Sequence, residues 1–393
     1  MSVKGLDLGA RWFAGKDRAV TDVSRVARAG GLTTLEVSYA DGPAERYLDI
    51  PAGFLWADLL ARLREGVVDG LELRPAPALE ALAPRGQAAE RVPATDQSNS
   101  LVAIGERLLL KAYRLIRPGR QPEVELLRAL DGRGAPVPAF GGSIHWGDTT
   151  VAVLQEFVPD VEAGWEAPIE RAAAALRGDA PFAESEWRAV GRVAGALHAA
   201  LAQAFEPVPA TAADRGRWRL EAEEALAEAT RNDEEVAERA PEIRARLASL
   251  ATGPPPLLTR IHGDLHVAQL LRRGEGADPL VIDFEGDPTR PLADRLRPDT
   301  PLRDVASLLR SVDHVGSAAS RRAAGAAPET WIADARGAVL DGYVSAAPHA
   351  VDAELLDALE VAKECSELVY AQRVLPEWLY APRLGLRRLL EDG

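Results

Sequence analysis

The chain of 393 residues carries 46 basic and 60 acidic side chains, which gives a formal net charge of −14. This charge argues against a nucleic-acid-binding protein, because such a protein needs a basic face to neutralise phosphates. The single cysteine, Cys365, excludes an internal disulfide and a cysteine-based zinc site. The first residues show no apolar signal segment, and no stretch approaches the ~18 apolar residues of a membrane span. We therefore expect a soluble cytoplasmic protein without a membrane partner.

The first part of the chain is expected to be rich in strands. Alternating apolar and polar residues predict a β-rich cap over residues 1–90, with strands at 31–39 and 45–50. A stretch rich in proline and alanine, at 74–91, has the composition of a connector.

Residues 91–158 are expected to form strands around one helix at 121–130, with a buried final strand at 149–157. Pro159 ends that strand, and the remainder, 159–393, is mainly helical. Within it we predict helices at 184–203, 214–240, 241–250 and from 302 onward, and short strands at 260–262 and 280–284. The fold class is therefore α+β.

The most informative segments are RIHGDLHVAQLL at 260–271 and PLVIDFEG at 279–286. Asp264 and Asp283 each end a short apolar run, and Gln269 lies five positions after Asp264. Phosphoryl transfer in kinase-type sites needs such a set, with one carboxylate as base and a second carboxylate plus an amide as metal ligands. We assign Asp264 as the catalytic base, and Gln269 and Asp283 as ligands of Mg²⁺, which prefers hard oxygen atoms.

Two neighbouring features are expected to brace this catalytic segment. The spacing of His262 and His266 could suggest zinc, but the strand–turn context favours ring hydrogen bonds within the loop. Asp304 is expected to cap its helix and to buttress the same loop.

These motifs, together with RWFAGK at 11–16, resemble the actinobacterial maltokinase-like branch of the aminoglycoside-phosphotransferase and protein-kinase-like fold. The resemblance implies a bilobal kinase-like protein with an N-terminal cap that uses ATP and Mg²⁺. It assigns Lys111 to the nucleotide α- and β-phosphates and Glu125 to the helix glutamate that pairs with this lysine. It also places the backbone groups of Glu156 and Val158 at the adenine base.

The resemblance places the phosphate-covering turn at DQSNS. This turn lacks the glycine-rich pattern of protein kinases and offers hydroxyl, amide and backbone donors instead, from Ser98, Asn99 and Ser100. Gly263 replaces the arginine of the protein-kinase catalytic loop, so we expect a small-molecule kinase that phosphorylation does not switch.

The acceptor is expected to bind near the C-terminal segment. Glu364 and Glu367 are i,i+3 neighbours on a predicted helix, and two like charges on one face are costly unless a cation lies between them. Patterning alone equally allows a solvated glutamate pair and a buried Trp378. The stretch ECSELVYAQRVLPEWLY resembles the signature of the actinobacterial glucosamine kinases, which implies that both acids and Trp378 bind the amino sugar. Asp299 and Arg303 are further candidates for holding sugar hydroxyls.

Three functions remain open at this point. The first is an ATP-dependent kinase that phosphorylates the 6-hydroxyl of glucosamine. The second is a kinase of maltose or another neutral sugar. The third is a nucleotide-binding module without turnover, which is disfavoured because the five expected machinery residues are all present: Lys111, Glu125, Asp264, Gln269 and Asp283.

Overall fold

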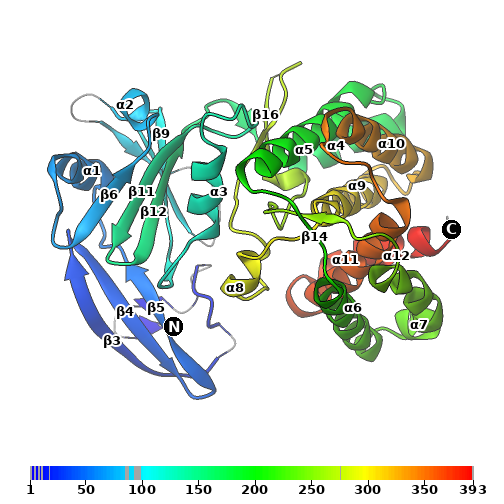
Figure 1. Ribbon diagram of the computed structural model, residues 1–393, viewed down its shortest axis with the longest axis horizontal. Helices are drawn as coiled ribbons and strands as arrows, with labels where there is room; N and C mark the ends of the chain where they lie inside the picture. Colours follow the sequence, from blue (N-terminus) through cyan, green and yellow to red (C-terminus); the bar gives the residue numbers. More distant parts are fainter. Residues whose placement is uncertain are drawn as a thin grey trace. The chain divides into compact units, whose positions relative to one another are not determined.

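The computed structural model divides the protein into two compact units. The β-rich unit comprises Met1–Asp131 and Pro138–Pro159, and the helical unit comprises Gly132–Val137 and Asp160–Gly393. The structure describes residues 2–3, 6–7, 9, 12–16, 18–84, 88–92, 99–274 and 276–391. Figure 1 shows the elements of each unit in the colours of the sequence.

The β-rich unit contains two antiparallel sheets of four and six strands. Each sheet combines strands from the expected cap, residues 1–90, with strands from the expected lobe, residues 91–158. The four-stranded sheet has the order β10-β5-β4-β3, with β3 at Val20–Ala29, β4 at Leu32–Tyr39, β5 at Gly42–Asp49 and β10 at Leu115–Ile116. The six-stranded sheet has the order β6-β11-β12-β9-β8-β7, with β6 at Leu71–Pro75, β7 at Glu90–Arg91, β8 at Ser100–Ile104, β9 at Leu108–Ala112, β11 at Phe140–Trp146 and β12 at Thr149–Glu156. Because β10 pairs with β5 and β6 pairs with β11, strands from before and after residue 90 share both sheets.

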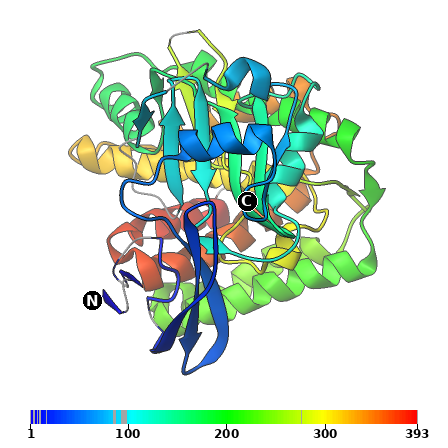
Figure 2. The same cartoon turned by 90° about the vertical axis from the view of Figure 1, so that its left-hand side faces the viewer.

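The strands β3, β4 and β5 form a long antiparallel ribbon (Figure 2). Gly30 and Gly31 connect β3 to β4 with positive φ angles of 56° and 94°, which glycine adopts without steric cost. The apolar side of the ribbon packs around buried Tyr47, Val37 and Phe13. The other described elements of this unit are β1 at Ser2–Val3, β2 at Leu6–Asp7, α1 at Trp56–Glu65, α2 at Leu79–Leu82 and α3 at Pro122–Leu130.

The helical unit surrounds the buried helix α9. Its helices are α4 at Glu166–Arg177, α5 at Glu184–Ala204, α6 at Ala212–Asn232, α7 at Glu234–Leu247, α8 at Leu292–Arg295, α9 at Leu302–Arg322, α10 at Glu329–Ala346, α11 at Ala353–Val374 and α12 at Tyr380–Glu391. Its 3₁₀ turns are η1 at Ala248–Ala251, η2 at Val267–Gln269 and η3 at Pro376–Trp378. Its short strands are β13 at Val161–Glu162, β14 at Val208–Pro209, β15 at Leu257–Leu258, β16 at Leu270–Arg273 and β17 at Leu280–Val281.

Two helix boundaries differ from the predicted ones. The helix predicted at 214–240 is two helices, because Asp233 interrupts the first and accepts a hydrogen bond from the backbone N–H of Val236 as the cap of α7. Pro241, the predicted start of a helix, lies inside α7. Residues 260–262 lie outside the strands, although Thr259 forms an isolated bridge with Asp299.

Helices α5 and α10 pack closely because glycines lie at their contact, and Figure 1 shows the two helices side by side. A Cβ atom at Gly191 would lie 1.9 Å from the carbonyl oxygen of Val339, and one at Gly342 would lie 2.0 Å from that of Arg188. The two backbones therefore approach closely only because both residues lack a side chain. Within the described ranges, no helix has the length and apolar character needed to cross a bilayer.

Candidate active site

The loop at 262–269 is anchored to the first turn of α9 by Asp304, which is 1% exposed. One carboxylate oxygen accepts the backbone N–H of His262 and the other accepts that of Gly263, both at 2.8 Å. The Nε2 atom of His198 lies 3.1 Å from the same carboxylate. Burial opposes ionisation, but the hydrogen bond and charge of His198 lower the pKa of Asp304. The expected buttress is therefore confirmed, whereas the expected helix cap is wrong, because the N-cap of α9 is Pro301, which makes no side-chain capping hydrogen bond.

The two histidines of the loop hold its conformation through ring hydrogen bonds, as the sequence predicted. The Nδ1 atom of His262 accepts the backbone N–H of Asp264 at 3.3 Å, so its Nε2 atom donates to the carbonyl of Ile282 at 2.8 Å. The Nδ1 atom of His266 accepts the backbone N–H of Ala268 at 3.3 Å. Burial lowers the pKa of His262, and it lowers that of His266 to about 3, so both rings are neutral at pH 7.

Gly263 permits the turn that presents Asp264. Its φ angle is +84°, and a Cβ atom there would lie 3.4 Å from the Cα atom of Gly286. The arginine that protein kinases carry at this point would be strained in this backbone conformation. This local geometry accounts for the departure that the sequence showed at position 263.

Asp264 has the acidity of a base that works near neutral pH. Burial raises the pKa of its carboxyl to about 7, the ammonium of Lys363 opposes this shift, and the carboxylate of Asp287 adds to it. The Nε2 atom of His266 lies 3.9 Å from an oxygen of Asp264. A positioned base is most effective when its pKa is close to the working pH.

The two expected metal ligands lie next to each other. The side-chain amide of Gln269 donates to a carboxylate oxygen of Asp283 at 3.3 Å. Asp283 has a φ angle of +67°, a left-handed conformation that non-glycine residues adopt rarely and mostly at functional sites. A carboxylate and an amide oxygen are hard donors, so the pair fits Mg²⁺ in kind.

In the β-rich unit, the carboxylate that pairs with Lys111 belongs to Glu123. Its Oε2 atom lies 3.0 Å from the Lys111 ammonium, and the side chain is 1% exposed. Tyr113 donates to Glu123 at 2.6 Å, and the amide of Gln155 does so at 3.4 Å. Both oxygens of this buried carboxylate therefore have a polar partner on or next to the strands β9 and β12.

This ion pair corrects the assignment of Glu125 as the partner of Lys111. Glu125 is ion-paired with Arg120 in the loop before α3. Residues two positions apart on a helix point to different sides. Both glutamates belong to the segment PEVE within one helical turn, so the sequence offered no local reason to prefer Glu123 over Glu125 as the partner of Lys111.

The remaining nucleotide-binding candidates stay predictions. Ser98 lies outside the described residues. Asn99 accepts the backbone N–H of Arg114 at 3.4 Å, and Ser100 begins β8. The backbone N–H of Glu156 donates to Ala139, and Val158 follows the end of β12.

On α11, the two acids expected at the acceptor have different surroundings. Glu364 is fully buried, its Oε2 atom lies 3.2 Å from Nε2 of His314, and a Cβ atom at Gly385 would lie 2.1 Å from its Oε1 atom. Burial raises the pKa of Glu364 well above its ordinary value. The side chain lies in the packing between α9, α11 and α12, so these contacts do not support its expected role in binding the sugar, which stays a prediction.

Glu367 already has cationic partners within the protein. Its carboxylate lies 3.0 Å from the ammonium of Lys363 and 3.6 Å from the guanidinium of Arg310. Although burial disfavours the charge, these two cations lower the pKa of Glu367. The cations beside Glu367 are thus supplied by the chain itself, and an ammonium on the sugar is not needed to balance its charge.

Trp378 belongs to an aromatic group that reaches the catalytic loop. Its ring centroid lies 6.5 Å from that of Trp165, which stacks on His266 at 5.3 Å. The ring of Tyr380 also stacks on Trp378, with 6.2 Å between the ring centroids. Sequence reasoning missed Trp165, because nothing around it marks a site and only the tertiary fold brings it to His266.

Lys363 was also missed, although its i,i+4 spacing to Glu367 on a predicted helix was a usable signal. A cavity of about 500 Å³ in the helical unit is lined by Lys363, by Gly263 and Asp287 of the catalytic region, and by side chains of α6 and α11.

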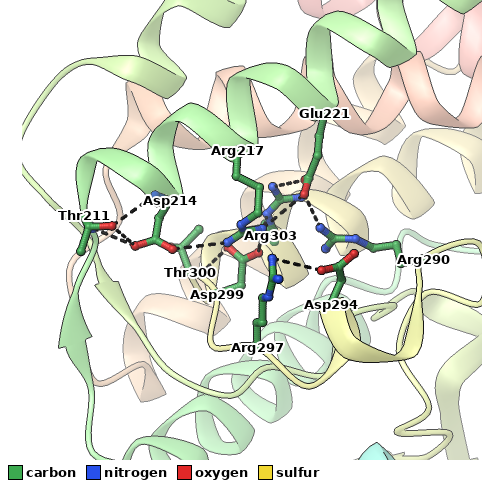
Figure 3. A network of polar contacts seen from close by, with 10 residues as sticks. All are labelled: Thr211, Asp214, Arg217, Glu221, Arg290, Asp294, Arg297, Asp299, Thr300 and Arg303. Carbon is green, nitrogen blue, oxygen red and sulfur yellow. Dashed lines mark hydrogen bonds and ion pairs between the residues drawn. The ribbon is translucent and has the colours of Figure 1, made fainter.

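Asp299 and Arg303 lie in a cluster of ion pairs between α6 and the start of α9 (Figure 3). One oxygen of Asp299 lies 3.2 Å from Arg217 and 3.1 Å from Arg303, and the other accepts the backbone N–H of Thr300 at 2.8 Å. Arg303 also contacts Glu221 at 2.8 Å. Asp299 is ion-paired with two arginines, so these contacts do not support its expected role at sugar hydroxyls, which stays a prediction. Arg303 lines the 500 Å³ cavity.

Comparison with known proteins agrees with this geometry. Residues 89–340 match the model of a family described as the phosphotransferase enzyme family. The glucosamine kinase of Mycolicibacterium smegmatis is 33% identical over 328 residues, which cover 77% of this chain and 80% of the relative. That of Streptacidiphilus jiangxiensis is 33% identical over 330 residues, which cover 77% and 74%.

Solved structures give the same relationship. A glucosamine kinase in complex with glucosamine, ADP and inorganic phosphate superposes with a TM-score of 0.76 at 27% identity, covering 95% of each chain. A crystal form of glucosamine kinase superposes with a TM-score of 0.77 at 26% identity, covering 100% of this chain and 98% of the other. The predicted α+β kinase-like fold and the resemblance to glucosamine kinases are confirmed. The chain belongs to the phosphotransferase enzyme family and, within it, to the glucosamine kinases.

Proposed function

We propose that the protein transfers the γ-phosphoryl group of ATP to the 6-hydroxyl of glucosamine and releases glucosamine 6-phosphate and ADP. The observation that carries this proposal is the loop that presents Asp264, which Asp304 braces from below and which leads directly into the Gln269–Asp283 pair. A base on the braced loop and a metal-binding pair beside it are what phosphoryl transfer to an alcohol requires. Membership of the glucosamine kinases supports the choice of acceptor.

Asp264 acts as the base in this reaction. As the acceptor oxygen bonds to the γ-phosphorus, the bond from that phosphorus to the oxygen of the β-phosphate breaks, and the hydroxyl proton passes to Asp264. The surroundings that raise the pKa of Asp264 to about 7 make it a stronger proton acceptor than an exposed aspartate. The neutral ring of His266 beside it adds no charge to oppose the transfer.

The nucleotide is held by groups that each unit contributes separately. In the β-rich unit, Lys111 contacts the α- and β-phosphates, and its ion pair with Glu123 fixes its position. The carbonyl of Glu156 and the N–H of Val158 bind the adenine. In the helical unit, Gln269 and Asp283 would hold Mg²⁺, which neutralises phosphate charge when bound.

The aromatic group supports a sugar as the acceptor. Sugars bind with the apolar face of the ring against an aromatic side chain. Trp378 and Trp165 provide such faces, and the stacking of Trp165 on His266 connects them to the base. We assign Trp378 to the sugar ring and Trp165 to its support.

A sugar panel tests the proposal. With ATP and Mg²⁺, ADP release should be much faster with glucosamine than with glucose, N-acetylglucosamine or maltose, and ³¹P–¹H correlation spectra should place the phosphate on the 6-carbon. A preference for maltose would make the protein a neutral-sugar kinase, and phosphate on another carbon would contradict the assigned hydroxyl.

The metal assignment has a test that is independent of turnover. Asp283→Ala should abolish the Mg²⁺-dependent tightening of ATP binding measured by calorimetric titration, because the carboxylate is the charged ligand of the pair. Asp278→Ala is the control, since Asp278 is exposed and ion-paired with Arg192. An unchanged metal dependence in the Asp283 variant would contradict the assignment.

A further inference from the structure

Lys363 is a partly buried cation, with 20% of its side chain exposed, among acidic side chains close to the catalytic base. It lies on α11, with its ammonium 3.0 Å from Glu367 on the same helix and 3.9 Å from Asp287 in the loop after Asp283. A lone ammonium in such a place would lose its proton to escape the cost of burial. Burial does oppose its charge, but Glu367, Asp287 and Asp264 together raise the pKa of Lys363, so it stays protonated.

The charges around Asp264 come from three neighbouring elements. Two of them are cations, Lys363 on α11 and Arg310 on α9, and both lower the pKa of Asp264. Two are anions, Asp287 in the following loop and Glu367 on α11, and both raise it. The nearby rings of His266 and His262 are neutral at pH 7 because burial lowers the pKa of each.

Lys363 lines the same cavity of about 500 Å³ as Gly263, the residue before Asp264 in the catalytic loop. Among these charges, it opposes the effect of burial on Asp264 most strongly. It is also placed by two acids on different elements, so its position is defined by the tertiary fold and not by α11 alone. Arg310 has other commitments, because it contacts Glu367 and the ring of His314.

We propose that Lys363 is a positioning residue of the phosphoryl transfer: held between Glu367 and Asp287, its ammonium keeps the carboxylate of Asp264 anionic and ready to accept the acceptor proton. This role rests on the proposed function of Asp264 as the base. It makes α11 part of the catalytic machinery through its lysine, while the helix acids serve to place that lysine.

The first test compares Lys363→Met and Lys363→Arg with the parent over pH 5.5 to 9.5, with saturating ATP and glucosamine. Loss of the ammonium should move the acid limb of the pH profile of kcat to higher pH by about one unit. At pH values below the limb, kcat should therefore fall about tenfold, and at alkaline pH it should return to the parent value. Lys363→Arg keeps the charge and should retain the parent limb. Arg244→Met removes an exposed cation of α7 and should change nothing.

The two hypotheses fail in different ways. A parent enzyme without glucosamine kinase activity would contradict the proposed function, and there would then be no pH profile of kcat to compare. An active parent whose Lys363→Met variant loses kcat equally at all pH values would overturn the role of Lys363 alone, since a purely structural residue predicts that result.

A second variant makes the test independent of whether Lys363→Met folds. Lys363→Gln removes the charge but keeps a polar side chain beside Glu367 and Asp287, so its acid limb should also move to higher pH. Thermal unfolding of each variant checks that the fold is intact. A limb that stays in place in folded Lys363→Gln would also overturn the proposal.

Discussion

The catalytic loop and helix α11 differ in how well the contacts of their side chains could be predicted from the sequence. The loop carries Asp264 and Gln269, Gln269 contacts Asp283 after β17, and Asp304 braces the loop backbone as expected. On α11, Glu364 points into the packing against His314, and Glu367 is neutralised by Lys363 and Arg310. The loop is held by local ring hydrogen bonds of its two histidines together with the carboxylate of Asp304, whereas the surroundings of the α11 acids depend entirely on the helices that pack on α11.

The largest effect should come from the loop. Asp264→Asn keeps the size of the side chain but cannot accept the proton, so kcat should fall by a factor of ~10²–10⁴ while ATP binding stays nearly intact. Steady-state kinetics and calorimetric ATP titration measure the two quantities. A variant within tenfold of the parent would remove Asp264 from its role and with it the contrast between loop and helix.

Helix α3 extends the contrast to the β-rich unit and should show a smaller effect. Glu123→Gln breaks a buried ion pair with Lys111, and such losses typically cost ~2–5 kcal/mol, so kcat/KM for ATP should fall by at least about tenfold. Glu125→Gln removes a carboxylate paired with Arg120 and is the matched control, with an expected change of less than about twofold. If Glu125→Gln were the more damaging variant, the original assignment would be right.

The two acids of α11 should differ in stability by a smaller amount and with opposite dependence on pH. Burial raises the pKa of Glu364, so the folded state holds a proton that the unfolded state releases, and its stability contribution is lost as pH rises above about 4.5. Although burial acts against it, the cations beside Glu367 lower the pKa of that group, so its contribution is full at neutral pH and is lost as pH falls.

Urea denaturation from pH 5 to 8.5 compares the two glutamine variants. Glu367→Gln should destabilise the fold by about 1–3 kcal/mol at pH 7, because Lys363 loses its nearest partner. Glu364→Gln imitates the protonated acid and should be within about 1 kcal/mol of the parent, with a relative stability that improves as pH rises. The reverse order of the two variants would show that Glu364 is charged in the fold.

Several features could be read from the sequence because they depend on neighbours along the chain. The α+β order, the helix at 121–130 with Pro122 in its first turn, and the spacing of Asp264, Gln269 and Asp283 belong to this class. The positive φ angle of Gly263 explains the glycine in HGD, and the ring hydrogen bonds of His262 and His266 explain why both histidines stand in the same short segment.

Other features were decided only when distant segments came together. Whether Glu123 or Glu125 pairs with Lys111 depends on which side of α3 faces strand β9. Lys111 lies on this strand and Tyr113 follows its last residue. The burial of Asp299 depends on Arg217 from α6, and the neutralisation of Glu367 depends on Arg310 from α9. The sequence by itself determined the kind of chemistry and the candidate residues for it, because the spacing of a motif is a property of the chain alone. Only the tertiary structure decided which acids are partners and which are buried, because the energy of a charge depends on the side chains that the fold brings beside it.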